Sequence, residues 1–102
     1  SILKVLISAV WYRIFSDTWK EQGGVISQGG TGSANTAVHT NCNLLTPYYG
    51  YYDGVGNCAW VNGASWFGPI IETKYTTYCI WVGWTTNHSS IMVNLHWTTF
   101  GY

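Results

Sequence analysis

The chain contains 102 residues, which is enough for one domain with a modest hydrophobic core. It carries four basic and four acidic residues, so the net charge at pH 7 is zero, whereas it carries 7 Trp, 8 Tyr and 3 Phe. Because phosphate backbones and anionic membranes are bound by clustered Lys and Arg, these sparse charges argue against nucleic-acid and membrane-surface binding.

Aromatic residues, Val, Ile and Thr favour β-strands and dominate the composition, so the sequence predicts an all-β fold. A small domain with so few charges has poor solubility when its apolar surface is left uncovered. We therefore expect its aromatic side chains to be buried between subunits, to form a sugar-binding surface, or to do both.

Residues 1–10 are largely apolar, with Lys4 among them. The run is too short to span a bilayer, and it lacks the basic start and small-residue cleavage site of a signal peptide. A continuous apolar run of this length is a strand buried on both faces or a helix segment, and its periodicity does not decide between them.

Residues 11–24 predict a hairpin of two short strands joined by a tight turn. Aromatic and β-branched residues flank residues 16–18, whose short polar side chains bond to the local backbone and favour a turn. A three-residue loop would align two supporting cross-strand pairs, Phe15 with Trp19 and Arg13 with Glu21.

Residues 25–36 are rich in Gly and Ser and predict a flexible loop, and no helix follows that would make the segment a phosphate-binding loop. Residues 37–45 alternate between apolar and polar side chains, which predicts a half-buried strand. The two predicted faces carry Val38, Thr40, Cys42 and Leu44 on the inside and His39, Asn41 and Asn43 on the outside.

Residues 46–68 are the most aromatic part of the chain. The turn dipeptides Asp53-Gly54, Gly56-Asn57 and Asn62-Gly63 predict two or three very short strands with tight loops. Tyr and Trp offer an apolar plane with a polar tip, on which sugars stack, while Asp and Asn bond sugar hydroxyls. The segment is therefore the best candidate for a recognition surface, although aromatic residues fill cores and subunit interfaces equally well.

Residues 75–84 predict the most buried strand, because both of its faces are apolar: one would face a sandwich core and the other a neighbouring subunit. Residues 87–90 predict a turn. Residues 91–100 alternate and predict a C-terminal strand that is tied into the sheet. Its two faces carry Ile91, Val93, Leu95 and Trp97 on one side and Met92, Asn94 and His96 on the other.

The chain has three cysteines, Cys42, Cys58 and Cys79, and their spacing does not match a zinc site. We therefore expect free, partly buried thiols in a protein assembled in a reducing cytoplasm. One disulfide with one free thiol would fit a secreted protein instead. No local signature joins a nucleophile to a His and an acid, and only four carboxylates are present. The sequence therefore predicts no enzyme, no catalytic residue, no metal and no cofactor.

The segment Trp-Tyr-Arg-Ile-Phe-Ser-Asp-Thr-Trp-Lys-Glu-Gln-Gly-Gly at residues 11–24 resembles a motif that opens the C-terminal domain of many bacteriophage tail-fibre proteins. That motif reads close to W-Y-R-[VI]-[YF]-S-D-G-W-x-E-Q-G-G. Two further segments also resemble that family: the C-terminal Phe100-Gly101-Tyr102 and the internal Thr46-Pro47-Tyr48. Thr18 stands where the family usually has Gly, which argues against a two-residue primed turn, because positive φ is costly for a β-branched residue.

The resemblance implies a trimeric fibre tip, built as a small antiparallel β-sandwich, that sits in the virion tail fibre after assembly in the host cytoplasm. Residues 1–10 would be a lead-in strand from the fibre shaft, and residues 11–102 the receptor-binding domain. The partner would be a bacterial surface glycan (lipopolysaccharide or capsule) or an outer-membrane receptor, without membrane insertion. We expect the receptor contacts to come from Tyr49, Tyr51, Tyr52, Asp53, Trp60 and Trp66, with Asn62 and His88 behind them.

Two other functions fit the same composition. One is a secreted β-barrel lectin or small-ligand-binding protein, monomeric or oligomeric, which suits the aromatic count but not the motif at residues 11–24. The other is a structural trimerisation cap without a receptor site, in which every conspicuous aromatic side chain would be buried.

Overall fold

The computed structural model describes residues 2–7, 10–32, 36–61, 66–85 and 88–102, and the side chains of these except 5–7, 28–32, 36, 59–61, 66–67, 85 and 88–93. Within these residues the fold is all-β, with two antiparallel sheets and no helix, as the composition predicts. A helix long and apolar enough to cross a membrane is accordingly not found among them.

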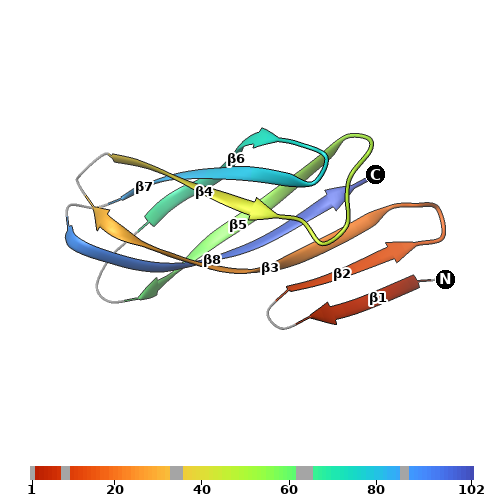
Figure 1. Ribbon diagram of the computed structural model, residues 1–102, viewed down its shortest axis with the longest axis horizontal. Helices are drawn as coiled ribbons and strands as arrows, with labels where there is room; N and C mark the ends of the chain where they lie inside the picture. The colour runs from red at the N-terminus through yellow and green to blue at the C-terminus, as the bar shows by residue number, and fades with distance from the viewer. Residues whose placement is uncertain (1, 8–9, 33–35, 62–65, 86–87) are drawn as a thin grey trace.

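Five strands form the larger sheet in the order β1-β2-β3-β8-β5, and three form the smaller sheet in the order β4-β7-β6. The strand bounds are β1 Ile2–Ile7, β2 Val10–Phe15, β3 Lys20–Gly32, β4 Thr36–Asn43, β5 Tyr52–Val61, β6 Trp66–Lys74, β7 Tyr78–Thr85 and β8 His88–Gly101. Figure 1 shows the smaller sheet lying across β3, β8 and β5, whereas β1 and β2 continue the larger sheet beyond it.

The core lies between the two sheets and is built by side chains that alternate along the facing strands. Trp81 is fully buried on β7, and Leu95 and Trp97 are buried on β8. The predicted alternation of residues 37–45 is confirmed, since Thr40 and Cys42 are buried while the three outward residues are exposed. In β8 the predicted inner face is confirmed for the two residues whose side chains are described, Leu95 and Trp97.

The hairpin at residues 11–24 has the predicted register. Phe15 N donates to Trp19 O (2.8 Å), and Thr18 N donates to Phe15 O (3.0 Å), so residues 16–18 form a three-residue loop. Arg13 lies opposite Glu21, with Nε 2.6 Å from Oε1. Thr18 has φ of 74°, the left-handed conformation that ends this type of loop and that suits Gly best.

Replacing Thr18 with Gly is expected to raise the free energy of unfolding by about 1 kcal/mol. A left-handed backbone costs roughly 1–2 kcal/mol for a residue with a Cβ, and part of this gain is offset by the larger chain entropy of Gly in the unfolded state. Urea unfolding measures the change. Ser16→Gly is the matched control, because Ser16 has no positive φ and should lose stability. Equal changes in the free energy of unfolding for the two variants would contradict this explanation.

The predicted flexible loop at residues 25–36 is wrong for residues 25–32, which continue β3. Val25 to Gly30 pair in unbroken register with β8, opposite His96 to Ile91, and the register shifts only between Gly30 and Gly32. The predicted turn at residues 87–90 is likewise wrong from His88 onward, where β8 begins. A long partner strand offers hydrogen bonds to the backbone of these segments even though their residues have a weak propensity for strands. Pairing within the sheet therefore outweighs the local preference for a loop or turn.

The predicted turns at Asp53-Gly54 and Gly56-Asn57 are also wrong, because both dipeptides lie inside β5; Asn62-Gly63 is outside the described residues. A Cβ at Gly54 would stand 2.9 Å from Ile71 Cδ1, and one at Gly56 would stand 2.8 Å from Trp81 Cζ3. These glycines therefore let β5 approach the smaller sheet closely, which is a common reason for Gly within a strand.

The strand predicted at residues 75–84 begins at Tyr78, and only one of its faces is fully covered. Cys79 and Trp81 point into the core, while Trp84 on the other face is exposed. On that outer face His39 from β4 and Glu72 from β6 meet across β7, with Nε2 3.0 Å from Oε2. The outer face is thus partly open in the single chain.

Residues 2–7 form a strand, β1, which is one of the two alternatives left open by its sequence. It pairs with β2 at the edge of the larger sheet, and Ile2 and Leu3 are more than half exposed rather than buried on both faces. The division into a lead-in strand and a receptor-binding domain stays a prediction.

Candidate functional site

A tyrosine-rich loop between β4 and β5 presents the two most exposed aromatic side chains of the described residues. We call residues 48–52 the tyrosine loop. Tyr49 and Tyr51 are 81% and 74% exposed, whereas Tyr48 and Tyr52 point into the core and stack on each other with ring centroids 4.2 Å apart. The loop therefore buries two of its four rings and displays the other two to solvent.

The backbone of the tyrosine loop is tied to the end of the chain. Tyr49 N and Gly50 N both donate to Tyr102 O (2.9 Å each), and Tyr102 N donates to Tyr51 O (3.2 Å). Trp19 packs against Tyr102 in an edge-to-face arrangement, with centroids 5.2 Å apart. Because these bonds fix the backbone, the exposed rings are held in place before any ligand arrives.

The buried tyrosines anchor the loop from below. Tyr52 is 4% exposed; its hydroxyl donates to Tyr75 O (2.7 Å) and accepts from Tyr75 N (3.1 Å). The hydroxyls of Tyr48 and Thr99 are hydrogen-bonded at 2.9 Å in the core. Burial raises the pKa of Tyr52 to about 12 and also raises the pKa of Tyr48.

These buried groups predict a loss of stability at high pH. Burial also raises the pKa of the Cys58 thiol to about 11, from an ordinary value of 9.0. The unfolded chain releases the protons of Cys58 and Tyr52 at lower pH than the folded chain does, so a rise in pH stabilises the unfolded state relative to the folded state. The free energy of unfolding should keep its full value below about pH 9, and the two raised pKa values together should lower it by roughly 5 kcal/mol by about pH 12.

Urea titrations at about pH 8, 10 and 11 measure this loss. Cys58→Ser removes the contribution of the thiol, so the free energy of unfolding should fall by less. The fall should also begin nearer pH 10, where tyrosine ionises in the unfolded chain. A free energy of unfolding that is constant from pH 8 to 11 would contradict the predicted effect of burial.

Gln22 anchors the segment that leads into the tyrosine loop. Its side chain is fully buried; Nε2 donates to Thr46 O (2.8 Å), and Oε1 accepts from Leu45 N (2.8 Å) and Thr46 N (3.2 Å). Lys20 Nζ donates to Pro47 O at 2.6 Å from the same strand. Gln22 and Lys20 of the hairpin motif therefore position the loop, which lies more than twenty residues away in the sequence.

Two of the four basic residues lie beside the two exposed rings of the tyrosine loop. Lys20 Nζ is 4.9 Å from the ring centroid of Tyr49, and Lys74 Nζ is 4.6 Å from that of Tyr51. Asp53 completes the group, because it accepts a hydrogen bond from the Tyr51 hydroxyl (3.3 Å) and lies 3.9 Å from Lys74 Nζ. Each exposed ring thus has a cation over it.

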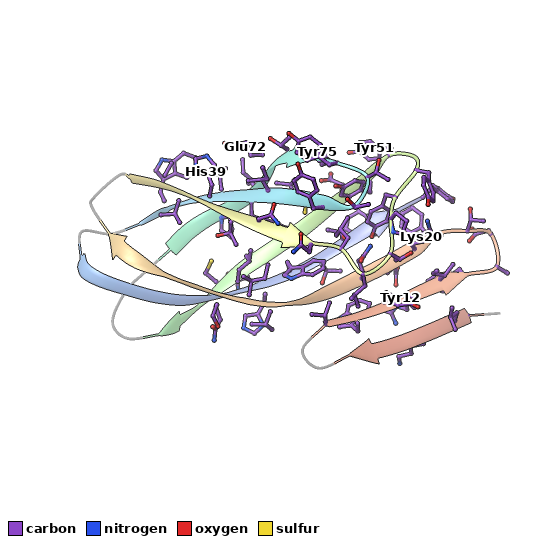
Figure 2. All side chains as sticks on the ribbon, in the orientation of Figure 1. Tyr12, Lys20, His39, Tyr51, Glu72 and Tyr75 are labelled. Atoms are coloured by element: carbon purple, nitrogen blue, oxygen red, sulfur yellow. The ribbon has the colours of Figure 1, made fainter. Side chains whose placement is uncertain are left out.

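Two hollows flank Gly50 on the tyrosine loop. One of about 410 Å³ lies against β6 and the β6–β7 turn, and one of about 550 Å³ lies against the hairpin. The first is lined by Tyr48, Tyr49, Gly50, Tyr51, Tyr52, Lys74, Tyr75 and Thr76, and the second by Ile14, Thr18, Lys20, Tyr49, Gly50 and Tyr102. Figure 2 shows Tyr51, Tyr75 and Lys20 at the end of the molecule where the C-terminus lies. Hollows of this size match small ligands.

The predicted receptor contacts separate into three groups. Tyr49, Tyr51 and Asp53 lie together at the tyrosine loop, and Tyr52 lies there too but is buried beneath it. Asn62 is outside the described residues, and so are the side chains of Trp60, Trp66 and His88. By backbone position Trp60 is near the far end of the ten-residue strand β5, opposite Val93. The structure therefore does not bring Trp60 to the tyrosine loop.

Sequence reasoning missed Lys20, Lys74, Tyr75 and Tyr102 as parts of this site. All four are more than twenty residues from the tyrosine loop in the sequence, and only the fold brings them close to it. No local sequence signal therefore marks them as parts of the site. Among the described residues no group of three His, Cys, Asp or Glu side chains is placed to hold a metal ion.

The geometry of the tyrosine loop is the main guide to function. Comparisons of the chain with protein-family models, with curated proteins and with solved structures found no match. The site is therefore interpreted from its own residues, together with the resemblance of residues 11–24 to the tail-fibre motif.

Proposed function

We propose that this chain is the receptor-binding tip domain of a bacteriophage tail fibre, and that the tyrosine loop attaches it to a lipopolysaccharide or capsule glycan on the bacterial surface. The proposal places the protein in the virion and gives it no enzymatic role. One observation carries it: Tyr49 and Tyr51 are largely exposed although their backbone is fixed by hydrogen bonds to Tyr102. Large rigid aromatic planes in solvent are typical of recognition surfaces.

The chemistry around these rings suits a sugar chain. The C–H faces of pyranose rings stack on Tyr planes, and the Asp53 carboxylate accepts hydrogen bonds from hydroxyls. Lys20 and Lys74 supply donors beside each ring, and Lys20 has no carboxylate within ion-pair distance among the described residues. Glycans that carry carboxylate or phosphate groups would therefore gain a charge-assisted contact at Lys20.

The proposed assembly is a homotrimer. Support comes from apolar side chains that the single chain leaves exposed, among them Ile2 and Leu3 on the edge strand β1 and Trp84 on the smaller sheet. Three sites on one fibre raise the overall avidity by orders of magnitude even when each site binds weakly.

The test measures binding to lipopolysaccharide and capsular polysaccharide purified from candidate host strains. Changing Tyr49 and Tyr51 together to Ala should weaken binding 10- to 100-fold, as expected for central aromatic contacts, without lowering thermal stability. His39→Ala is the matched control, because His39 is exposed on the smaller sheet and away from the loop. A folded double variant that binds as the unchanged protein does would refute the proposed site.

Light scattering separates this proposal from a secreted lectin. A trimer has a mass of about 34 kDa, three times the chain mass of 11.4 kDa, whereas a stable monomer would favour the lectin. A trimerisation cap predicts instead that Tyr49 and Tyr51 become protected from solvent when the trimer forms.

A further inference from the structure

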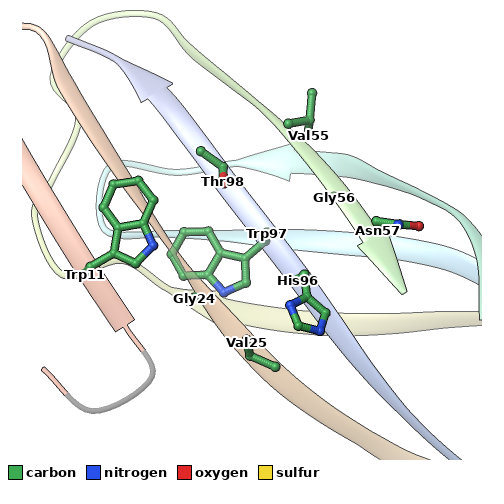
Figure 3. Close-up of a pocket in the computed structure, with 9 residues that line it drawn as sticks. All are labelled: Trp11, Gly24, Val25, Val55, Gly56, Asn57, His96, Trp97 and Thr98. Carbon is green, nitrogen blue, oxygen red and sulfur yellow. The ribbon is translucent and has the colours of Figure 1, made fainter. Parts of the chain in front are cut away.

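A separate groove of about 530 Å³ lies on the outer face of the larger sheet, on the side away from the core. Figure 3 shows Trp11 on β2 at one side of the groove and Val55 and Asn57 on β5 at the other, with His96 and Thr98 on β8 between them. The β2–β3 hairpin and the sequence-distant strands β5 and β8 therefore contribute to one surface feature, which the sequence analysis did not single out.

The Trp11 indole forms a fixed wall of this groove. A Cβ at Gly23 would lie 2.9 Å from Trp11 Cζ2 and 2.6 Å from Trp97 O, so only Gly at this position lets the indole pack against β3. The Arg13 guanidinium carbon lies 5.0 Å from the indole centroid and is itself held by Glu21. An aromatic wall that is held in this way loses little entropy when a ligand binds.

Several polar groups around the groove have hydrogen-bonding capacity that no described residue uses. Among the described residues, no hydrogen bond is made by the Trp11 indole N–H, the His96 ring or the Thr98 hydroxyl. Asn57 uses Oδ1 to accept from Cys58 N (3.0 Å), which leaves its amide N–H groups free. Four polar groups around a mostly apolar hollow form the usual pattern of a small-ligand site.

We propose that this groove is a second carbohydrate site, which takes an uncharged pyranose ring. The Trp11 wall and Val25 would contact the apolar face of the ring, while Asn57, His96 and Thr98 would bond its hydroxyls. None of the described residues that line the groove is Lys, Arg, Asp or Glu, in contrast to the tyrosine loop with its two lysines.

The inference rests on and deepens the proposed glycan binding, because the edge strand β5 leads from the groove to the tyrosine loop. Asp53, Val55 and Asn57 are every second residue and share the outer side of this strand, and the Tyr51 hydroxyl donates to Asp53. Asp53 and Val55 are two steps apart along the strand, which is roughly 7 Å at the usual rise per residue. One oligosaccharide that passes along the edge of β5 would therefore reach both sites.

The experiment is a titration of the ¹⁵N-labelled protein with methyl glycosides of glucose, galactose, mannose and N-acetylglucosamine at about pH 7.5. At least one should give saturable shifts of the Trp11 indole N–H and of the amides of Gly24, Val25 and Thr98. His96→Ala and Asn57→Ala should each weaken that binding at least fivefold, because both exposed side chains lose a hydroxyl contact. His39→Ala should leave the affinity unchanged.

The Tyr49→Ala, Tyr51→Ala double variant distinguishes this inference from the proposed function. It should lose bacterial polysaccharide binding but keep the monosaccharide shifts at the groove. The inference is overturned when no glycoside gives saturable groove shifts, when the His96 and Asn57 variants bind as tightly as the His39 control, or when those variants lose the trimer instead, which would make the groove a subunit interface.

Discussion

Replacing Gln22 with Ala is expected to lower the free energy of unfolding by about 3 kcal/mol and to displace the tyrosine loop. The change leaves Leu45 N, Thr46 N and Thr46 O without the partners they have in the folded chain. Each buried polar group that loses its partner costs roughly 1–3 kcal/mol, and relaxation of the segment recovers part of the total.

Urea unfolding measures the stability of the Gln22 variant, and polysaccharide binding measures the position of its loop. Asn41→Ala is the matched control, because Asn41 is an exposed amide that bonds only to the Asn43 side chain among the described residues. That control should change stability by less than about 0.5 kcal/mol. Equal stability of the two variants would show that Gln22 does not anchor the loop.

The second large effect is expected at Gly56, where Ala should cost about 2–3 kcal/mol. The new methyl carbon would stand 2.8 Å from Trp81 Cζ3 and 3.2 Å from Leu95 Cδ1, both well inside van der Waals contact. Trp81 and Leu95 are fully buried, so the close packing of the core restricts their movement. Overpacking of a dense core typically costs 1–3 kcal/mol, so the value belongs in the upper part of that range.

Gly50→Ala is the control for the Gly56 variant, because its nearest contact would be an ordinary 3.4 Å to Tyr102 Cβ. Chemical denaturation should show a loss well below that at Gly56. Combining Gly56→Ala with Trp81→Phe tests the cause, since a smaller ring leaves room for the methyl group. The two losses should then be less than additive, and full additivity would mean that Trp81 is not what the new methyl group meets.

Most of the regular features were predictable because they depend on neighbours in the sequence. The hairpin at residues 11–24 has its turn residues and its cross-strand pairs within one segment, so its register followed from local chemistry. The side-chain period of two likewise identified the inner faces of β4 and of the end of β8. The all-β class and the two antiparallel sheets are confirmed.

The errors share one physical cause. Glycine-rich segments at residues 25–32 and 53–57 have the composition of loops, yet they lie in β3 and β5 because β8 pairs with both. The glycines of β5 are explained by close approaches, Gly54 to Ile71 and Gly56 to Trp81. A composition rule cannot detect a neighbour that is forty or more residues away in the sequence.

The candidate site divides in the same manner. Tyr49, Tyr51 and Asp53 were predicted from aromatic and turn density, and they do lie together on the surface. That density does not distinguish them from Tyr52, which is buried. Which of these side chains is buried depends on the smaller sheet, because it covers one side of β5 and leaves the other side open.

The sequence by itself determined the strand class, the hairpin register and the alternation of inner and outer side chains, because each depends on residues within a few positions. Only the tertiary structure decided which tyrosines reach solvent and that Lys20 and Lys74 stand over them. It also decided that Gln22 holds the loop and that four strands enclose a groove beside Trp11. These features arise where strands distant in sequence are brought side by side, and that pairing is selected by the packing of the whole core.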